Sequence, residues 1–240
     1  MAGVAARRKA DDLIAAGRVS VNGAPPPPGG LLVVPGRDRV EVDGTEVLPA
    51  AQHRYAAANK PVGYLSAVSD RSRRPLVTSM VPAELRDGSA GRQPLHPVGR
   101  LDLKSHGLVL LTDDGELSFR LQHPRHHVEK EYRVLVGGRP TEKELDRLRK
   151  GIDLEEGRTA PATVKVLPGG AAGKTALRVI LRQGWKRQLR RSFQAIGYQV
   201  ADLARVRIGP LELGTLEEGR GRTLTGEEVA ALRQAVDLEP

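Results

Sequence analysis

One carboxylate near the middle of the chain has the surroundings of a reactive group. Asp102 lies between Arg100 and Lys104, just ahead of the apolar run 107–112 (GLVLLT), which Asp113-Asp114-Gly115 closes. Such a run between turn residues is typical of a strand buried on both faces, so Asp102 is expected in the loop entering that strand. A carboxylate in this position is a candidate reactive group. An aspartate can also simply cap a turn, and these residues alone leave both interpretations open.

A second candidate stretch is 184–196 (GWKRQLRRSFQAI), in which positive charge is concentrated. Its cations are Lys186, Arg187, Arg190 and Arg191. Helical spacing places Leu189, Phe193 and Ile196 on one apolar side, which predicts an amphipathic helix with a basic face. The charges of that face are either solvated or in contact with an anionic partner.

Two further patterns suggest sites that the sequence does not support. His123, His126 and His127 are close together, but no cysteine and no clear helical pair with a third ligand accompany them, so no metal site is predicted. The segment 169–175 (GGAAGKT) has Pro168 where a phosphate-binding loop of the Walker type requires glycine, and a strand pattern follows it. We therefore predict neither a metal nor a nucleotide cofactor.

Composition points to a polyanionic partner. The 240 residues carry a formal net charge of +9, only 3% are aromatic and none is cysteine. This favours contact with nucleic acid through phosphates over base stacking, and it excludes disulfides and a cysteine nucleophile. No apolar run approaches the roughly 20 residues of a membrane span, and the N-terminus lacks a signal-peptide core, so we expect a cytoplasmic protein without a membrane partner.

The chain divides into a small N-terminal module and a larger domain. Residues 5–16 predict a helix, 19–21 a short strand, and 39–47 a hairpin around Asp43-Gly44. This helix and hairpin occupy residues 1–48, with a proline-rich surface loop at 25–28, and residues 49–54 are expected to be a linker.

Residues 55–235 alternate strands with a few helices, and residues 236–240 form an expected tail. The expected strands are 55–59, 64–66, 107–112, 130–136, 163–167, 176–181 and 200–208. Asp113 or Asp114 is expected to cap a helix through Leu121, with Leu117, Phe119 and Leu121 buried. Capping boxes at Thr141 and Thr225 predict helices to about Lys150 and Ala235.

The N-terminal module resembles the small RNA-binding domain named after ribosomal protein S-four. The similarity lies in AARRKADDLIAAGRVSVNG followed by PGRDRVEVDG. It implies that Arg7, Arg8, Lys9 and Arg18 face RNA. That family usually has a further short helix ahead of this one, so we expect either that the start codon is misplaced or that the module is truncated at its N-terminus.

The larger domain resembles the RsuA/RluB family of ribosomal RNA pseudouridine synthases. The similarity lies in HPVGRLDLKSHGLVLLTDDGEL, in KEY at 130–132 and in GWKRQLRR at 184–191, with support from NKPVG and RVRIGPLELG. It implies an α+β fold with a mixed, mainly antiparallel sheet and a central catalytic cleft. The implied reaction isomerises uridine to pseudouridine without a cofactor.

The resemblance also implies roles for individual residues. Asp102 would be the catalytic carboxylate, Tyr132 would stack on the base, and Arg190 would pair with Asp102. Leu189 would line the base pocket, Arg100 would fill the space left by a flipped uridine, and Lys186 and Arg187 would contact the substrate. Gln183 and Trp185 stand where the family usually has glutamate and a basic residue.

These residue types suit that chemistry. A carboxylate must be ionised to act as a nucleophile, and a nearby guanidinium favours the ionised form. A base inside structured RNA must be extruded before it can react, and stacking on an aromatic side chain can hold it. We expect a monomeric isomerase that acts on ribosomal RNA or a pre-ribosomal particle, with the large subunit favoured. The alternative is a non-catalytic RNA-binding or ribosome-assembly factor, which would have no need of Asp102.

Overall fold

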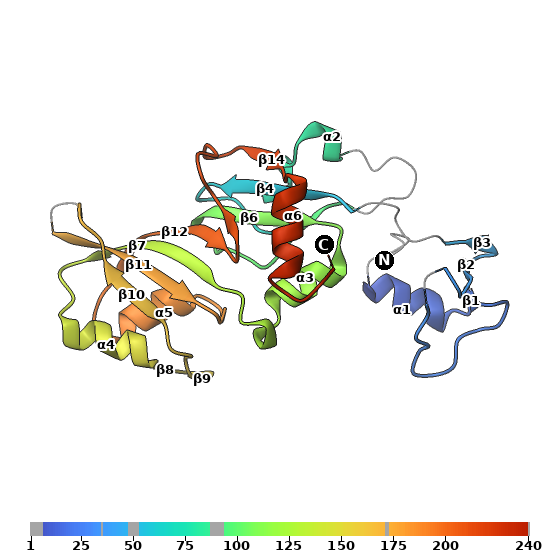
Figure 1. The fold of residues 1–240 in the computed structure, drawn as a ribbon, viewed down its shortest axis with the longest axis horizontal. Helices are drawn as coiled ribbons and strands as arrows, with labels where there is room; N and C mark the ends of the chain where they lie inside the picture. The colour runs from blue at the N-terminus through green and yellow to red at the C-terminus, as the bar shows by residue number, and fades with distance from the viewer. Residues whose placement is uncertain (1–6, 35, 48–52, 87–93, 171–172, 240) are drawn as a thin grey trace.

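The computed structural model describes residues 7–34, 36–47, 53–86, 94–170 and 173–239, and its main body is a nine-stranded sheet (Figure 1). The strands are β4 (Tyr55–Lys60), β5 (His96–Pro97), β6 (His106–Thr112), β7 (Lys130–Gly137), β10 (Thr163–Val166), β11 (Lys174–Leu181), β12 (Val200–Ile208), β13 (Leu211–Glu212) and β14 (Gly221–Thr223). Their order is β10-β11-β7-β12-β6-β4-β14, with β13 on β12 and β5 on β6. Among the pairs of strands in the described part of this sheet, only β12 and β6 are parallel. The expected mixed, mainly antiparallel α+β architecture is confirmed.

Helices flank the sheet, and α3, α4 and α6 begin where the capping residues predict them. They are α2 (Ala83–Arg86), α3 (Gly115–Gln122), α4 (Glu142–Lys150), α5 (Gln188–Ala195) and α6 (Gly226–Gln234), with 3-10 turns η1 (Val77–Met80) and η3 (Pro124–His126) and a small hairpin of β8 (Asp153–Leu154) and β9 (Gly157–Arg158). Thr141 and Thr225 each form the expected capping box, and Asp114 rather than Asp113 caps α3. No helix in the described ranges is long and apolar enough to cross a membrane.

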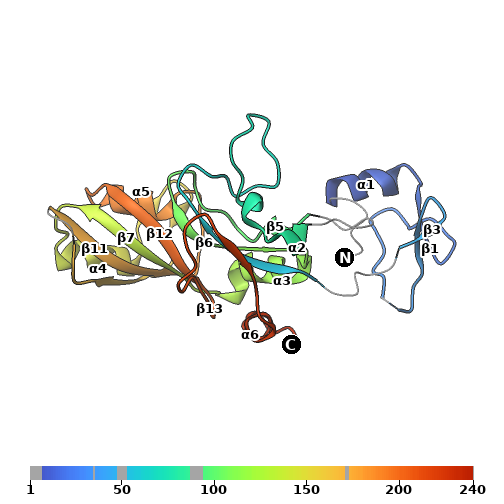
Figure 2. The same cartoon turned by 90° about the horizontal axis from the view of Figure 1, so that it is seen from above.

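The N-terminal module contains the expected helix and hairpin. Helix α1 (Arg7–Ala15) accompanies a three-stranded sheet of β1 (Val19–Val21), β2 (Val40–Val42) and β3 (Thr45–Glu46). Figure 2 shows this module at one end of the chain's fold, away from α4 and α5. Residues 49–52 of the expected linker 49–54 lie outside the described residues, whereas His53 and Arg54 are described.

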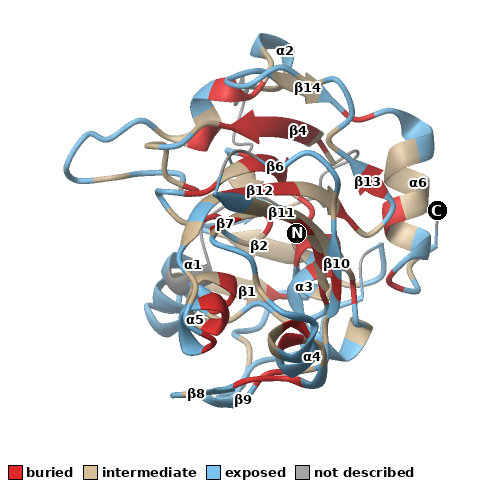
Figure 3. Ribbon diagram, turned by 90° about the vertical axis from the view of Figure 1, so that its left-hand side faces the viewer, coloured by how far each residue is buried: buried red, intermediate tan, exposed pale blue. Residues whose placement is uncertain are grey.

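The two ends of the large sheet are stabilised by separate cores. Strands β7, β10 and β11 pack with α4 and α5 around Phe193, which is fully buried. Strands β4 and β6 contribute to two further clusters, one with α3 and α6 and the other with η1. The buried colouring of β4 and β6 in Figure 3 agrees with the expectation that the 107–112 strand is covered on both faces.

The halves meet where β12 runs parallel to β6, and this contact depends on Gly107. Its Cα pairs with that of Arg205, and its φ of +101° is a conformation that favours glycine. A Cβ at this position would lie 2.2 Å from the Arg205 carbonyl oxygen. Glycine at the start of the buried strand thus allows the two halves to join.

Three expectations about the elements are wrong. Residues 64–66 form no strand, because the pairing of Leu65 with Leu76 ends at once where the chain turns into η1. Phe119 is 49% exposed, since it lies two residues from Leu117 and so on the opposite side of α3. Val236, the first residue of the expected tail, is fully buried in the core beside α6.

Candidate active site

The loop of residues 101–105, which carries Asp102, is fixed through its backbone. Each of its five successive carbonyl groups accepts a hydrogen bond. The donors, in order, are the Ser66 hydroxyl to Leu101 (3.3 Å), the Ser105 amide to Asp102 (3.0 Å), the Gly63 amide to Leu103 (2.8 Å), the Arg190 guanidinium to Lys104 (2.7 Å) and the Lys60 ammonium to Ser105 (2.7 Å). The loop is thereby tied to β4, to the segment after it and to α5.

The side chain of Asp102, by contrast, has no hydrogen bond or ion pair within the described part of the chain, and it is half-buried. In an aspartate that caps a turn, the carboxylate accepts a hydrogen bond from a backbone amide. Here the turn is closed by the backbone itself, through the bond between the Ser105 amide and the Asp102 carbonyl. The geometry therefore favours a carboxylate held ready for a ligand over one that caps a turn.

Lys60 lies close to this carboxylate and is completely buried. Its Nζ donates to the carbonyl oxygens of Pro61 (2.8 Å) and Ser105 (2.7 Å). Burial lowers the pKa of the Lys60 ammonium to about 8, while attraction to Asp102 and Glu218 opposes that fall. Lys60 thus binds the backbone of the candidate loop through its ammonium group.

Sequence reasoning missed this lysine. NKPVG was noted only as a segment resembling the family, although a lone lysine ending the apolar run YAAAN is an unusual residue to bury. Ser66, whose hydroxyl also accepts from the Leu101 amide at 3.1 Å, gave no signal in the sequence.

Arg190 reaches the loop but does not form the expected ion pair with Asp102. Its guanidinium donates to the carbonyl oxygens of Lys104 (2.7 Å) and Val200 (3.0 Å), and its buried Nε has no partner among the described residues. The reason lies in the position of α5, from which the side chain meets the backbone of the turn rather than the carboxylate. Arg190 therefore links α5, β12 and the Asp102 loop.

Tyr132 lies at the boundary between the two halves of the sheet. It is half-buried on β7, and its ring packs against both the core around Phe193 and the cluster containing Leu101. The second of these clusters includes Leu101, the residue directly before Asp102. The structure thus brings Asp102, Tyr132 and Arg190 into one region.

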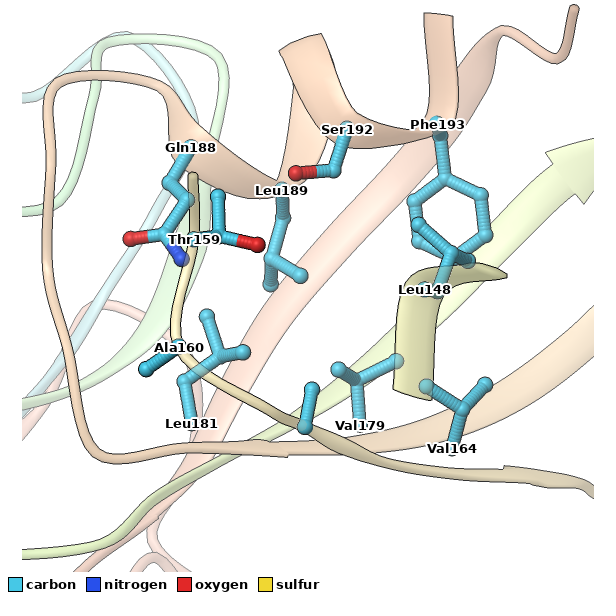
Figure 4. Close-up of a pocket in the computed structure, with 11 residues that line it drawn as sticks. Leu148, Thr159, Ala160, Val164, Val179, Leu181, Gln188, Leu189, Ser192 and Phe193 are labelled. Carbon is cyan, nitrogen blue, oxygen red and sulfur yellow. The ribbon is translucent and has the colours of Figure 1, made fainter. Parts of the chain in front are cut away.

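Leu189, by contrast, faces the interior. It is buried among the side chains of α4, β10 and β11 and lines the small pocket shown in Figure 4 with Thr159, Leu181 and Phe193. Neither Asp102 nor Tyr132 lines that pocket. The pocket belongs to the core behind α5.

The remaining predicted contact residues are on the surface. Arg100, Lys186 and Arg187 are exposed. Arg187 adopts a left-handed conformation at the N-terminus of α5. In the N-terminal module Lys9 is exposed, the side chains of Arg7 and Arg8 lie outside the described residues, and Arg18 pairs with Asp43.

The unusual residues before α5 close its first turn. The Gln183 side-chain oxygen accepts from the amide of Ala160 (2.9 Å) and from Gln188 (3.2 Å), while the Trp185 amide donates to Gln188 (3.0 Å). Among the histidines, the His123 ring accepts from the Arg125 amide and Arg125 donates to His126, so these side chains stabilise the turn after α3.

Comparison with known proteins identifies the family. The RNA pseudouridylate synthase family model matches residues 54–195. The chain is 40% identical over 240 residues to ribosomal large subunit pseudouridine synthase B of Bacillus subtilis, covering 98% of this chain and 93% of that protein. It is also 40% identical over 239 residues to an uncharacterized RNA pseudouridine synthase of Aquifex aeolicus, covering 99% and 92%.

A solved structure extends the similarity to the fold. The crystal structure of a pseudouridylate synthase superposes with a TM-score of 0.66 at 30% identity, covering 95% of this chain and 94% of that one. The chain belongs to the RNA pseudouridine synthase family and is an isomerase of RNA uridine. The family resemblance seen in the sequence is confirmed.

Proposed function

We propose that this enzyme isomerises a specific uridine of large-subunit ribosomal RNA, with Asp102 as the nucleophile. The observation that carries the assignment of Asp102 is the contrast within its loop: every carbonyl from Leu101 to Ser105 is hydrogen-bonded, whereas the carboxylate has no partner in the described residues. A nucleophile requires a fixed position and a free lone pair, and this loop supplies both.

The reaction divides into two substitutions at one carbon. A carboxylate oxygen of Asp102 forms a bond to the ribose C1′ while the bond from C1′ to the base nitrogen breaks. The base turns and its C5 bonds to C1′, which breaks the bond to Asp102 and regenerates the carboxylate. C5 then loses a proton and the freed nitrogen gains one, so the product is an isomer of uridine.

The neighbouring residues have supporting roles in this proposal. Tyr132 stacks on the extruded base and assists removal of the C5 proton, and Arg190 orients the Asp102 loop through the Lys104 carbonyl. Arg100 occupies the space that the uridine leaves, and Lys186 and Arg187 contact phosphates, whereas the burial of Leu189 in the core behind α5 removes it from the proposed base site. Arg100, Lys186 and Arg187 are all exposed, which supports their proposed contacts with RNA.

The ribosomal substrate is inferred from the named relatives, and the N-terminal module is inferred to bind it. The Bacillus subtilis relative is a large-subunit enzyme by name and matches nearly the whole chain, N-terminal module included. Arg7, Arg8, Lys9 and Arg18 would contribute the additional RNA contacts. We place the reaction in the cytoplasm, on ribosomal RNA or an assembling particle, with the protein acting as a monomer.

Replacing Asp102 with asparagine tests the central assignment. Asp102→Asn keeps the shape of the side chain but removes its nucleophilic charge, so conversion of uridine in a large-subunit ribosomal RNA transcript should fall below detection. RNA affinity should stay within about twofold, because the substitution leaves the phosphate contacts in place. Turnover at the wild-type rate in this variant would refute the role of Asp102.

The choice of substrate needs a separate measurement. Pseudouridine mapping on both ribosomal RNAs, from cells with and without the protein, should show one uridine of the large subunit losing its modification. Loss at a small-subunit position instead would contradict the proposed substrate without affecting the assignment of Asp102.

A further inference from the structure

The half of the sheet formed by β10, β11 and β7 has one face covered by helices and one that carries a row of cations. Val164, Val179 and Tyr132 are neighbours in register and face the core with α4 and α5. Figure 1 shows both helices on one side of these strands. Because side chains alternate along a strand, the next residues point to the opposite side, which we call the outer face.

The strand register aligns three cations on that outer face. Lys165 of β10 pairs with Arg178 of β11, which in turn pairs with Arg133 of β7. We call these three residues the cation row. Neighbouring strands are about 4.8 Å apart, so the row extends over about 10 Å. Successive phosphates of a nucleic-acid strand rise by about 3.4 Å in a duplex, so the row has the length of about three such steps.

Acidic residues neutralise this row only in part. Arg178 donates to both carboxylate oxygens of Glu131 at 2.7 Å, but Glu131 also accepts from Arg207 at 3.2 Å. Arg133 and Lys165 are exposed, and their side chains have neither a hydrogen bond nor an ion pair within the described residues. Asp202, whose Cα is paired with that of Leu135 on this part of the sheet, is engaged with His106.

Directly opposed like charges on adjacent strands destabilise a sheet. Two such pairs in succession therefore concentrate positive potential on the outer face and weaken the fold, unless an anion binds there. A polyanion with regularly spaced charges has the matching chemistry, and the substrate of this family is such a polymer.

We propose that the outer face of β10, β11 and β7 binds the phosphate backbone of RNA, at a site separate from Asp102. Tyr132 and α5 are on the opposite side of the same strands, so the uridine being modified and the RNA on the outer face are different segments. A long structured RNA would contact both sides around the edge strand β10, whereas a short hairpin in the active site would contact only one. This surface distinguishes long substrates from short ones.

The double variant Arg133→Gln with Lys165→Gln tests the proposal in the full chain. Both side chains are exposed and the exchange removes like-charge repulsion, so the melting temperature should not fall. The matched control is Lys143→Gln with Arg147→Gln, which removes two exposed cations from α4, on the side of the sheet opposite the cation row. The two variants have the same net charge.

The measurement is RNA affinity as a function of salt for a long ribosomal RNA transcript and for a short hairpin. Each lost phosphate contact should reduce the slope of log affinity against log salt by about 0.7 to 0.9. For the long transcript the slope of the outer-face variant should fall by about 1.5, and affinity at low salt should fall about tenfold. The hairpin should show no such change, nor should the control variant with either RNA.

Equal slopes for the outer-face variant and the control on the long transcript would overturn the proposal. Binding of an acidic polypeptide to this face, with RNA affinity unchanged, would also overturn it. Because binding is measured without turnover, the outcome is independent of whether Asp102 is the nucleophile and of which uridine is modified.

Discussion

At the scale of single residues, the candidate site is a carboxylate without a hydrogen bond or ion pair among the described residues, on a loop whose backbone carbonyls from Leu101 to Ser105 all accept hydrogen bonds. Burying a charge is unfavourable unless it is paired, and Lys60 shows how the fold accommodates one beside Asp102. Its ammonium has two carbonyl acceptors, and burial nevertheless lowers its pKa to about 8. The loop is therefore bonded to an ammonium group that loses its proton more easily than an ordinary lysine does.

This balance predicts a pH-dependent stability. With the Lys60 pKa lowered by burial, the folded protein binds fewer protons than the unfolded chain between about pH 8 and the ordinary lysine value of 10.5. The free energy of unfolding should therefore rise with pH across that interval, by at most about 3 kcal/mol from this group. Below pH 8 the penalty is present in full.

Lys60→Met removes that contribution. Denaturant unfolding of both proteins between pH 7.5 and 10.5 should show the wild type gaining stability relative to the variant as pH rises. Lys130, whose pKa burial also lowers to about 8, titrates in both proteins and cancels in the difference. If the free energies of unfolding of the two proteins changed with pH in parallel, the lowered pKa of Lys60 would be contradicted.

Arg190 acts by holding the loop, which predicts an effect on turnover more than on binding. Lysine cannot donate to the Lys104 and Val200 carbonyls in the planar geometry of arginine, so Arg190→Lys should loosen the Asp102 loop. We expect kcat to fall about 10²-fold, the cost of a displacement of about 1 Å, with RNA affinity little changed.

Arg191→Lys is the matched control for this variant. Arg191 is the next residue of α5, but it pairs with Glu156 and not with the loop. Its replacement should leave single-turnover rates within a few fold. An equal fall in kcat for both variants would show that α5 as a whole, rather than the Arg190 contact, was disturbed.

At the scale of elements, the decisive contact is the parallel junction of β6 and β12. It joins two halves with separate cores and sets the position of the loop that precedes β6. Only glycine fits at position 107, since the backbone has positive φ and the Arg205 carbonyl lies where a Cβ would be.

Gly107→Ala should therefore destabilise the domain by about 2 kcal/mol or more, through conformational strain and the close contact. Thermal unfolding would show a lowered melting temperature, and turnover should fall with it because the Asp102 loop enters β6. Gly184→Ala is the control, because a Cβ at Gly184 meets nothing within 4 Å. Equal melting temperatures for the two variants would refute the close packing at the junction.

At the scale of the whole molecule, exposed positive charge is spread over several separate surfaces. The N-terminal module, the surface around α5 and the cation row all carry exposed cations. The net charge of +9 is thus distributed over several surfaces rather than gathered in a single basic patch.

Deleting residues 1–48 should weaken RNA binding without unfolding the rest. The family match begins at residue 54 and the large sheet contains no strand from the module, so the remaining domain should keep its cooperative thermal transition. RNA affinity and the slope of its salt dependence should both fall, by a unit or more in the slope. Loss of the thermal transition in the truncated protein would contradict the proposed domain boundary.

The sequence by itself predicted the order of most elements through local patterns such as capping boxes and alternation, and its resemblance to a family supplied the class of fold and the candidates Asp102, Tyr132 and Arg190. Its errors were local as well, as with Phe119, which was assigned to the core although its helical phase places it on the surface. Only the tertiary structure decided which atoms meet. That Arg190 holds a carbonyl instead of the carboxylate, that Lys60 is buried beneath the loop, and that three cations align across β10, β11 and β7 all follow from strand register and helix placement. Long-range packing fixes these features, and no spacing along the chain encodes them.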